Sequence, residues 1–214
     1  MNNLFVKIYK FRKAFEYRIL KYITISDFRN KTTLLGDSHN IAPEAKVLLL
    51  YGSKQEDIIL KDYCEVFGTL VSENGGKIII NEWSKLGYGC KIHCVNRIEI
   101  GKDVAIADDV TIIDNNSHPL CPADRRYMRR TPHGSLERSS QFGANAPISI
   151  GENVWIGTHS RICKGVTIGD NSIIGANSVV THDVPANSVA VGNPARVVKE
   201  HIDEITSPIF PINK

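Results

Sequence analysis

The sequence DNNSHP, which ends at Pro119, combines residue types that can transfer protons and bind hydroxyl groups. His118 suits a general base because the unperturbed pKa of histidine lies near neutral pH. Asp114 is a candidate to orient the imidazole or to bind a ligand hydroxyl, and Asn115 and Asn116 are candidates to contact the ligand. The alternative is a turn in which these side chains make only local hydrogen bonds.

The stretch that follows, residues 115–147, is long and lacks the regular aliphatic residues found on either side of it. Long loops in compact domains are usually functional or disordered. Its arginines begin with Arg125 and Arg126, and these two are candidates to contact anionic groups of a ligand. The alternative is a solvated, flexible loop whose charges keep the protein soluble.

A six-residue repeat must position these residues. Between residues 148 and 191 neither a helical period nor simple strand alternation fits the apolar spacing. Four units begin with Ile-Gly (IGENVW, IGTHSR, IGDNSI and IGANSV). A branched aliphatic residue returns every six positions, at Ile150, Ile156, Ile162, Ile168, Ile174 and Val180. A similar frame runs through residues 80–112, so residues 115–147 are predicted to be an insertion between two repeat blocks.

Each six-residue unit is expected to form one short strand and one tight corner. Three units then close a triangular coil, and successive coils stack in parallel with the aliphatic residues as interior ladders. Glycine after the aliphatic residue, followed by Asn or Asp, suits the left-handed backbone of corners. An ordinary β-sandwich would not hold one register through six successive units. The predicted fold is therefore all-β, a parallel β-helix over residues 31–194.

Apolar side chains recur at helical spacing among basic ones in residues 4–22, which predicts an amphipathic basic helix within residues 1–30. Seven Lys and Arg against two acidic residues give that segment +5, so the remaining chain carries −2 of the total +3. Such a helix can contact the anionic inner surface of a membrane. The alternative is that its apolar face packs on the protein's own core or on a neighbouring subunit.

Asn193 and Pro194 fit the start of a helix, with Asn193 as the N-cap and Pro194 in the first turn. We therefore predict that residues 195–214 form a short helix, running towards Ile205, and a tail. This helix would cover strand edges at the end of the β-helix.

Composition excludes several classes of protein. The charge of +3 is mild, and the repeats carry no stripe of basic residues interleaved with aromatics, so nucleic acid is not an expected partner. No apolar run approaches the length of a membrane span or of a signal-peptide core, so we expect a cytoplasmic protein. The five cysteines fit neither a disulfide scaffold nor a zinc site.

Residues 80–199 resemble the hexapeptide-repeat acyltransferases. Within that group they are similar to the sugar O-acetyltransferases of the maltose and galactoside type and to enzymes that acetylate surface polysaccharides. The matching segments are IIDNNSHPL (112–120), the repeats at 153–188 and VGNPARVV (191–198). The resemblance implies a left-handed β-helix, acetyl-CoA as acyl donor, no metal, and a homotrimer with acyl sites between subunits. Galactoside-type enzymes carry an upstream asparagine near residues 87–89, where this chain has Gly-Tyr-Gly, so the resemblance does not identify the acceptor sugar.

By the same resemblance, His118 is the general base for direct attack of a hydroxyl on the thioester, without an acyl-enzyme. The backbone N–H of Thr158 would face the thioester carbonyl. Glycine and alanine suit close approach of the pantetheine arm, whereas Arg and Lys suit phosphate. The other residues implied to bind acetyl-CoA are Trp155, Gly157, Gly175, Ala176, Thr181, His182, Arg196 and Lys199. For Trp155, packing at a subunit seam is the alternative.

The function expected from these residues is acetyl transfer to a sugar hydroxyl, in a surface polysaccharide, a lipopolysaccharide or a lipid-linked precursor. An N-acetyltransferase of an amino sugar is the alternative within the transferases. A non-catalytic β-helix scaffold is the alternative from another class. The γ-type carbonic anhydrases share the scaffold but need two histidines five residues apart, and the seven histidines of this chain include no such pair.

Overall fold

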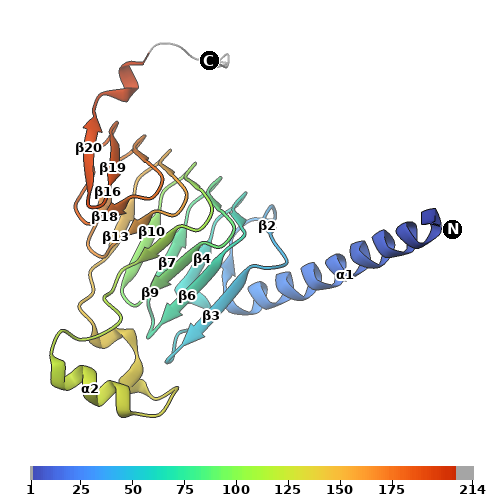
Figure 1. Ribbon diagram of the computed structural model, residues 1–214, viewed down its shortest axis with the longest axis horizontal. Coiled ribbons are helices and arrows are strands. Elements are labelled where there is room, and N and C mark those ends of the chain that lie inside the picture. Colours follow the sequence, from blue (N-terminus) through green and yellow to red (C-terminus); the bar gives the residue numbers. More distant parts are fainter. Residues whose placement is uncertain (1, 206–214) are drawn as a thin grey trace.

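The computed structural model describes residues 2–205, with side chains described from residue 5 onward. Within these residues, strands form three sheets that close a triangular prism (Figure 1). Sheet A contains β1 (Thr33–Leu34), β4 (Ile58–Leu60), β7 (Lys77–Ile80), β10 (Arg97–Ile100), β13 (Ile148–Ile150) and β16 (Thr167–Ile168).

Sheet B contains β2 (Asn40–Ile41), β5 (Glu65–Val66), β8 (Lys85–Leu86), β11 (Ala105–Ile106), β14 (Trp155–Ile156), β17 (Ile173–Ile174), β19 (Val189–Gly192) and β20 (Ala195–Lys199). Sheet C contains β3 (Lys46–Leu50), β6 (Thr69–Glu73), β9 (Lys91–Cys94), β12 (Thr111–Ile113), β15 (Arg161–Ile162) and β18 (Val179–Val180). One strand of each sheet makes one coil, and coils stack with strands in parallel, except for the antiparallel pair β19 and β20. This arrangement and the hexapeptide period fit a left-handed β-helix.

The predicted aliphatic ladders fill the interior of the prism. Burial of each such side chain stabilises the fold by roughly 1.5–3 kcal/mol. On sheet B the buried ladder is Ile41, Val66, Leu86, Ile106, Ile156, Ile174 and Ala190. The ladder thus begins at Ile41, well before residue 80, because Val and Leu replace Ile in the early coils and hide the period in the sequence.

Helix α1 (Asn2–Lys31) touches the prism only through its last turns. Phe28 is fully buried and closes the first coil, and the Thr24 hydroxyl donates a 2.8 Å hydrogen bond to the carbonyl of Pro43. The rest of α1 projects away from the prism, with residues 5–20 exposed (Figure 1). The alternative in which the apolar face of this helix packs on the chain's own core is therefore wrong. No helix in residues 2–205 has the length and apolar character of a membrane span.

The helix predicted to begin at residue 195 is absent, and this prediction is wrong. Residues 195–199 instead form β20, which pairs antiparallel with β19. Gly192, at a φ of 100°, begins the turn that reverses the chain, and β-branched Val197 and Val198 favour a strand. Pairing with β20 also satisfies the edge of sheet B. Only a 3₁₀ turn follows, at Ile202–Glu204, and the predicted tail at 206–214 lies outside the described residues.

The insertion leaves the β-helix after β12 and returns at β13. It contains helix α2 (Pro122–Arg130) and 3₁₀ turns at Leu136–Arg138 and Ser140–Phe142, where the sequence predicts only a loop. Met128 is the buried residue of α2, so this side chain anchors the otherwise exposed helix.

Candidate functional site

Asp114 lies at the start of the insertion, where the chain leaves sheet C. Its carboxylate is fully buried and accepts hydrogen bonds from four groups. The donors are the backbone N–H groups of Val95 (3.0 Å) and Asn96 (2.8 Å), the Nδ2 of Asn115 (3.0 Å) and the thiol of Cys94 (3.1 Å). Within the described chain, His118 is not among the groups that contact this carboxylate. Asp114 therefore holds the turn rather than the imidazole.

Asn115 also belongs to this turn. Its side chain is buried, and its Oδ1 accepts a 2.9 Å hydrogen bond from the backbone N–H of Ser117. Asn116, in contrast, is exposed. Of the two asparagines predicted to contact an acceptor, only Asn116 presents its side chain to solvent.

His118 is exposed at the edge between sheets C and A. Its Nδ1 lies 3.0 Å from the sulfur of Met128 on α2, and its backbone N–H donates a 2.7 Å hydrogen bond to the carbonyl of Asn116. Gly143, on the returning part of the insertion, packs against the same backbone. A Cβ at Gly143 would meet the amide nitrogens of His118 and Ser117 at 3.0 and 3.1 Å. Both arms of the insertion therefore fix the position of this histidine.

A hollow of about 230 Å³ opens beside the histidine, within the insertion. Its lining is mixed, with apolar and acidic side chains that can face the ring and the hydroxyls of a small polar ligand. The lining residues are Pro119, Asp124, Tyr127, Met128, Glu137 and Phe142. This hollow is the candidate acceptor site.

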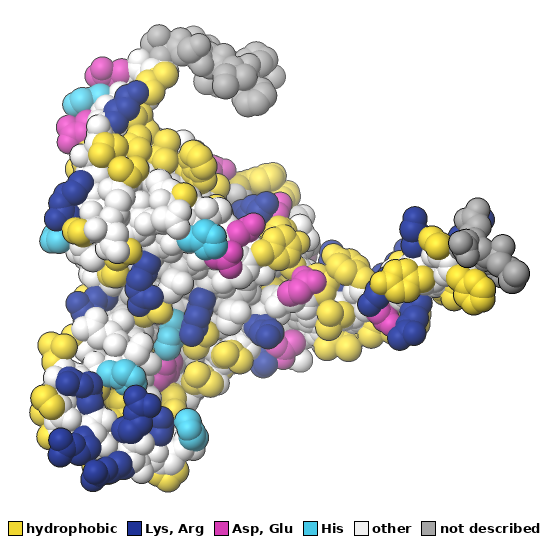
Figure 2. All heavy atoms as spheres, in the orientation of Figure 1, with side chains coloured by type: hydrophobic (Ala, Val, Ile, Leu, Met, Phe, Trp, Pro, Cys, Tyr) yellow, Lys and Arg dark blue, Asp and Glu magenta, His cyan; other side chains and the backbone are white. Residues whose placement is uncertain are grey.

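The two predicted arginines lie on α2. Arg125 donates hydrogen bonds to the carbonyls of Pro119 (3.2 Å) and Leu120, so its guanidinium braces the loop after the histidine. Arg126 is exposed. Lys and Arg side chains gather over this part of the molecule (Figure 2), and those on α2 are Arg125, Arg126, Arg129 and Arg130.

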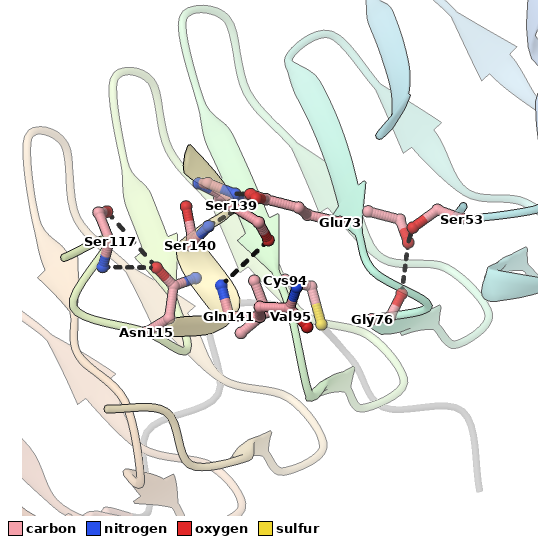
Figure 3. A network of polar contacts seen from close by, with 12 residues as sticks. Ser53, Glu73, Gly76, Cys94, Val95, Asn115, Ser117, Ser139, Ser140 and Gln141 are labelled. Atoms are coloured by element: carbon pink, nitrogen blue, oxygen red, sulfur yellow. Dashed lines mark hydrogen bonds and ion pairs between the residues drawn. The ribbon is translucent and has the colours of Figure 1, made fainter. Parts of the chain in front are cut away.

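A Glu–His pair under the insertion was not predicted from the sequence. The Glu73 carboxylate lies 2.7 Å from Nε2 of His93 and accepts a 2.6 Å hydrogen bond from the backbone N–H of Ser140. Figure 3 shows Glu73 pointing toward Ser139 and Ser140. Burial alone would raise the pKa of Glu73, but hydrogen bonds from His93, Ser139 and Ser140 outweigh it and hold the pKa below its usual value. The available sequence signal was an acidic residue, Glu73, at the end of the segment TLVSE that forms β6.

The residues implied to bind the acyl donor follow the edge between sheets B and C. Trp155 stands on the outer face of sheet B and is 54% exposed. Gly157 packs tightly on the next coil, since a Cβ there would lie 2.6 Å from the amide nitrogen of Ala176, which follows Gly175. The backbone N–H of Thr158 donates to no other described residue. This edge therefore offers a smooth backbone surface on which the N–H of Thr158 is available to a ligand.

The other residues implied to bind the acyl donor lie at the C-terminal end of the prism. His182 and Arg196 line one hollow of about 290 Å³, so the structure brings these two together. Thr181 is adjacent, with its hydroxyl 2.9 Å from Nδ1 of His182. Lys199 is exposed at the end of β20. These groups offer the hydrogen-bond donors and positive charge that phosphates need.

One chain does not bring the two halves of the site together. His118 lies at the edge between sheets C and A, whereas Thr158 lies at the edge between sheets B and C. The face of sheet C separates them, and a face of about five residues at about 3.3 Å each spans on the order of 15 Å. Within residues 2–205, no group of three or more His, Cys, Asp or Glu side chains is arranged to hold a metal ion.

Comparisons with known proteins agree with this architecture. The family model for the bacterial transferase hexapeptide (six repeats) matches residues 147–182. Galactoside O-acetyltransferase of Escherichia coli (strain K12) is 37% identical over 137 residues, which is 62% of this chain and 67% of that protein. The fold and this relative define a transferase built on hexapeptide repeats. The chain belongs to the hexapeptide-repeat acetyltransferase family, and it is an acyltransferase.

Two solved structures extend the comparison. The polySia specific acetyltransferase NeuO superposes with a TM-score of 0.62 at 26% identity, covering 80% of this chain and 67% of that chain. AntD, an N-acyltransferase from Bacillus cereus in complex with dTDP and 3-hydroxybutyryl-CoA, gives a TM-score of 0.55 at 19% identity, covering 79% and 84%. At that identity, AntD is evidence for the fold alone.

Proposed function

We propose that this protein transfers an acetyl group from acetyl-CoA to a sugar hydroxyl, with His118 as the general base. The observation that carries the proposal is the exposed imidazole beside a 230 Å³ hollow, on the scaffold of a family that includes a galactoside O-acetyltransferase. The acceptor proposed is a surface polysaccharide, a lipopolysaccharide or a lipid-linked precursor of one. The likeness to NeuO supports a polymeric acceptor.

The proposed mechanism is direct transfer. If Nδ1 of His118 carries the proton and faces the Met128 sulfur, Nε2 keeps its lone pair and takes the proton of the acceptor hydroxyl. The hydroxyl oxygen attacks the thioester carbonyl, and the oxyanion accepts a hydrogen bond from the backbone N–H of Thr158. Collapse of the intermediate breaks the C–S bond, and the imidazolium returns its proton to the departing CoA thiolate. No acyl-enzyme forms.

The proposed donor groove runs from the thioester to the nucleotide. Trp155 and Gly157 flank the reacting end, and the edge formed by Gly175 and Ala176 receives the pantetheine arm. Arg196, with Lys199, faces the phosphates, supported by the hollow that Arg196 shares with His182. The 3-hydroxybutyryl-CoA bound by AntD supports an acyl-CoA as the donor on this fold.

A homotrimer completes the proposed site. Because His118 and Thr158 lie on different edges of one prism, a neighbouring copy must supply the second edge. Mixing two variants tests this: one carries His118→Ala, and the other carries Trp155→Ala and Arg196→Ala. Each variant should be inactive alone. A mixed trimer should contain sites in which His118 comes from one variant and the donor residues come from the other. We expect mixing to restore activity. Two inactive pools that stay inactive after confirmed subunit exchange would contradict shared sites.

We also propose that α1 lies on an anionic membrane surface. Ile8, Phe11, Phe15, Ile19 and Tyr22 form an exposed stripe at helical spacing, on the side roughly opposite the buried Phe28 at 100° per residue. Lysines and arginines flank the stripe, so the charge complements anionic lipid. A second copy of α1 would fit the stripe but would repel the basic residues.

Vesicle binding tests the role of α1. The wild type should co-sediment with phosphatidylglycerol vesicles more strongly than with phosphatidylcholine vesicles. The Phe11→Ser, Phe15→Ser variant should lose this binding while acetyl transfer to soluble sugars continues. Unchanged sedimentation of the variant would remove the membrane proposal.

The central experiment measures CoA release from acetyl-CoA against neutral sugars, amino sugars and polysaccharides. His118→Ala should lower the rate by about 10²- to 10⁴-fold, as expected for loss of one general base, while acetyl-CoA binding survives. Turnover only with amino sugars would favour N-acetyl transfer. Absence of any CoA binding would favour the scaffold role instead.

A further inference from the structure

Two aromatic side chains stack on the outside of the second and third coils. The rings of Tyr63 and Trp83 lie 4.0 Å apart between centroids, with planes at 7°. They are 44% and 56% exposed, so the stack stands in solvent. Both occupy the corner between sheets A and B, since the amide of Trp83 donates to the carbonyl of Asp62, which precedes Tyr63.

The backbone at these two corners is unusual for aromatic residues. Tyr63 and Trp83 have φ values of 58° and 60°, in the left-handed region that bulky residues rarely adopt. The same corner in later coils holds residues suited to it, namely Asp103, Asn153, Asn171 and Asn187. In the later coils, the asparagine side chains at this corner hydrogen-bond to one another from one coil to the next. An unfavourable conformation retained twice for exposed aromatics indicates a role outside folding.

The stack borders a hollow of about 540 Å³ on sheet B. Charged and polar groups share this hollow with the rings, among them Asp37, His39, Glu65 and Lys85. A second aromatic pair, Phe67 and Tyr88, stands at the opposite edge of the same sheet, with Lys85 Nζ 5.2 Å from the Phe67 ring. The surface therefore has a polar floor between two aromatic walls.

We propose that this surface binds a saccharide chain. Sugar rings present C–H groups on their faces and hydroxyls at their rims, so aromatic walls can bury the faces while the polar floor hydrogen-bonds the hydroxyls. The inference rests on the proposed function, and it deepens it: the acceptor would be an oligosaccharide or polysaccharide that contacts the enzyme beyond the reacting sugar.

The position of the surface fits an extended acceptor. Sheet B pairs Glu65 with Lys85, Lys85 with Ala105 and Ala105 with Trp155. Lys85 therefore lies two strands from Trp155, which is proposed to bind the acyl donor. At about 4.8 Å per strand, this is a distance of about 10 Å. Ala105 leaves a low surface between them. A chain whose reacting sugar lies at the donor groove can reach the aromatic walls along this face.

The kinetic test compares acceptor lengths. Trp83→Ala should raise KM for long acceptors at least about tenfold, a loss near 1.4 kcal/mol, with kcat and the KM for a monosaccharide unchanged. Trp83→Phe should restore most of the affinity. Leu48→Ala, at a side chain 43% exposed on sheet C, is the matched control. An equal KM for long acceptors in wild type and Trp83→Ala would overturn the inference while leaving acetyl transfer intact.

A binding test separates the inference from catalysis. Electrophoretic mobility is measured in gels that contain galactan, maltodextrin or polysialic acid. The two proteins compared are the His118→Ala variant and the double variant His118→Ala, Trp83→Ala. Retardation that depends on Trp83 supports the surface even if no acetyl transfer is found. No retardation by any of the three, or a change in oligomeric mass with Trp83→Ala that assigns the rings to a subunit contact, would overturn it.

Discussion

The Glu73 carboxylate on β6 accepts a 2.6 Å hydrogen bond from the backbone N–H of Ser140, 67 residues later in the chain. This contact ties the returning arm of the insertion to the rigid prism. Gly143, three residues further on, packs against the backbone of His118. Glu73 therefore helps to position His118, the candidate base, without contacting it.

Glu73→Gln should loosen this arm and destabilise the protein by about 1–3 kcal/mol, because the buried partners lose a charged acceptor. The pKa of Glu73 is depressed on folding, so its contribution is present above the unfolded value of about 4.3 and is lost as pH falls through the lower folded value. The stability gap between wild type and variant should therefore narrow in acid. Denaturant unfolding from pH 7 to 3 measures it, and a gap independent of pH would contradict this account.

Asp114→Ala should destabilise the protein by about 3 kcal/mol, since buried donors lose their acceptor. His118→Ala, at an exposed residue, should leave stability within about 0.5 kcal/mol while removing activity. Urea unfolding and CoA release on both variants distinguish the roles. If Asp114→Ala kept full stability and lost only turnover, Asp114 would be catalytic after all.

Phe28→Ala should cost about 3–5 kcal/mol because it opens a cavity at the end of the core. Phe11→Ala removes a ring that is 76% exposed on the same helix and should leave the unfolding midpoint unchanged. Thermal unfolding of the two variants compares them directly. Equal effects would mean that the free part of α1 is packed in solution.

Thiol reactivity should divide the cysteines. Burial raises the pKa of Cys64 and of Cys90 to about 11, and burial with the Asp114 charge also raises the pKa of Cys94. Cys121 is exposed and Cys163 partly so. At pH 8 a disulfide reagent should label these two quickly and the other three only after unfolding. Rapid labelling of Cys64 would show that the early coils open.

The hexapeptide spacing predicted the β-helix because every sixth residue must bury an aliphatic side chain in the core. It predicted the insertion because this spacing stops where the chain leaves the coils. The pattern failed at Asn193-Pro194, where a local helix signal lost to pairing with the open edge of sheet B. It also could not show that the Asp114 carboxylate accepts hydrogen bonds from backbone amides, since those amides belong to another coil. Glu73 and His93 meet only through stacking of coils, which sequence neighbours do not reveal.

The rise of the β-helix sets a distance that bears on how an acceptor would be delivered. Helix α1 covers the first coil, and Trp155 lies on the fifth coil, four strand spacings along sheet B from β2. At about 4.8 Å per spacing, these four steps separate the two by roughly 20 Å. The membrane contact proposed for α1 and the proposed donor groove are therefore separated by these coils. An acceptor attached to the membrane beside α1 would have to span them to reach the groove.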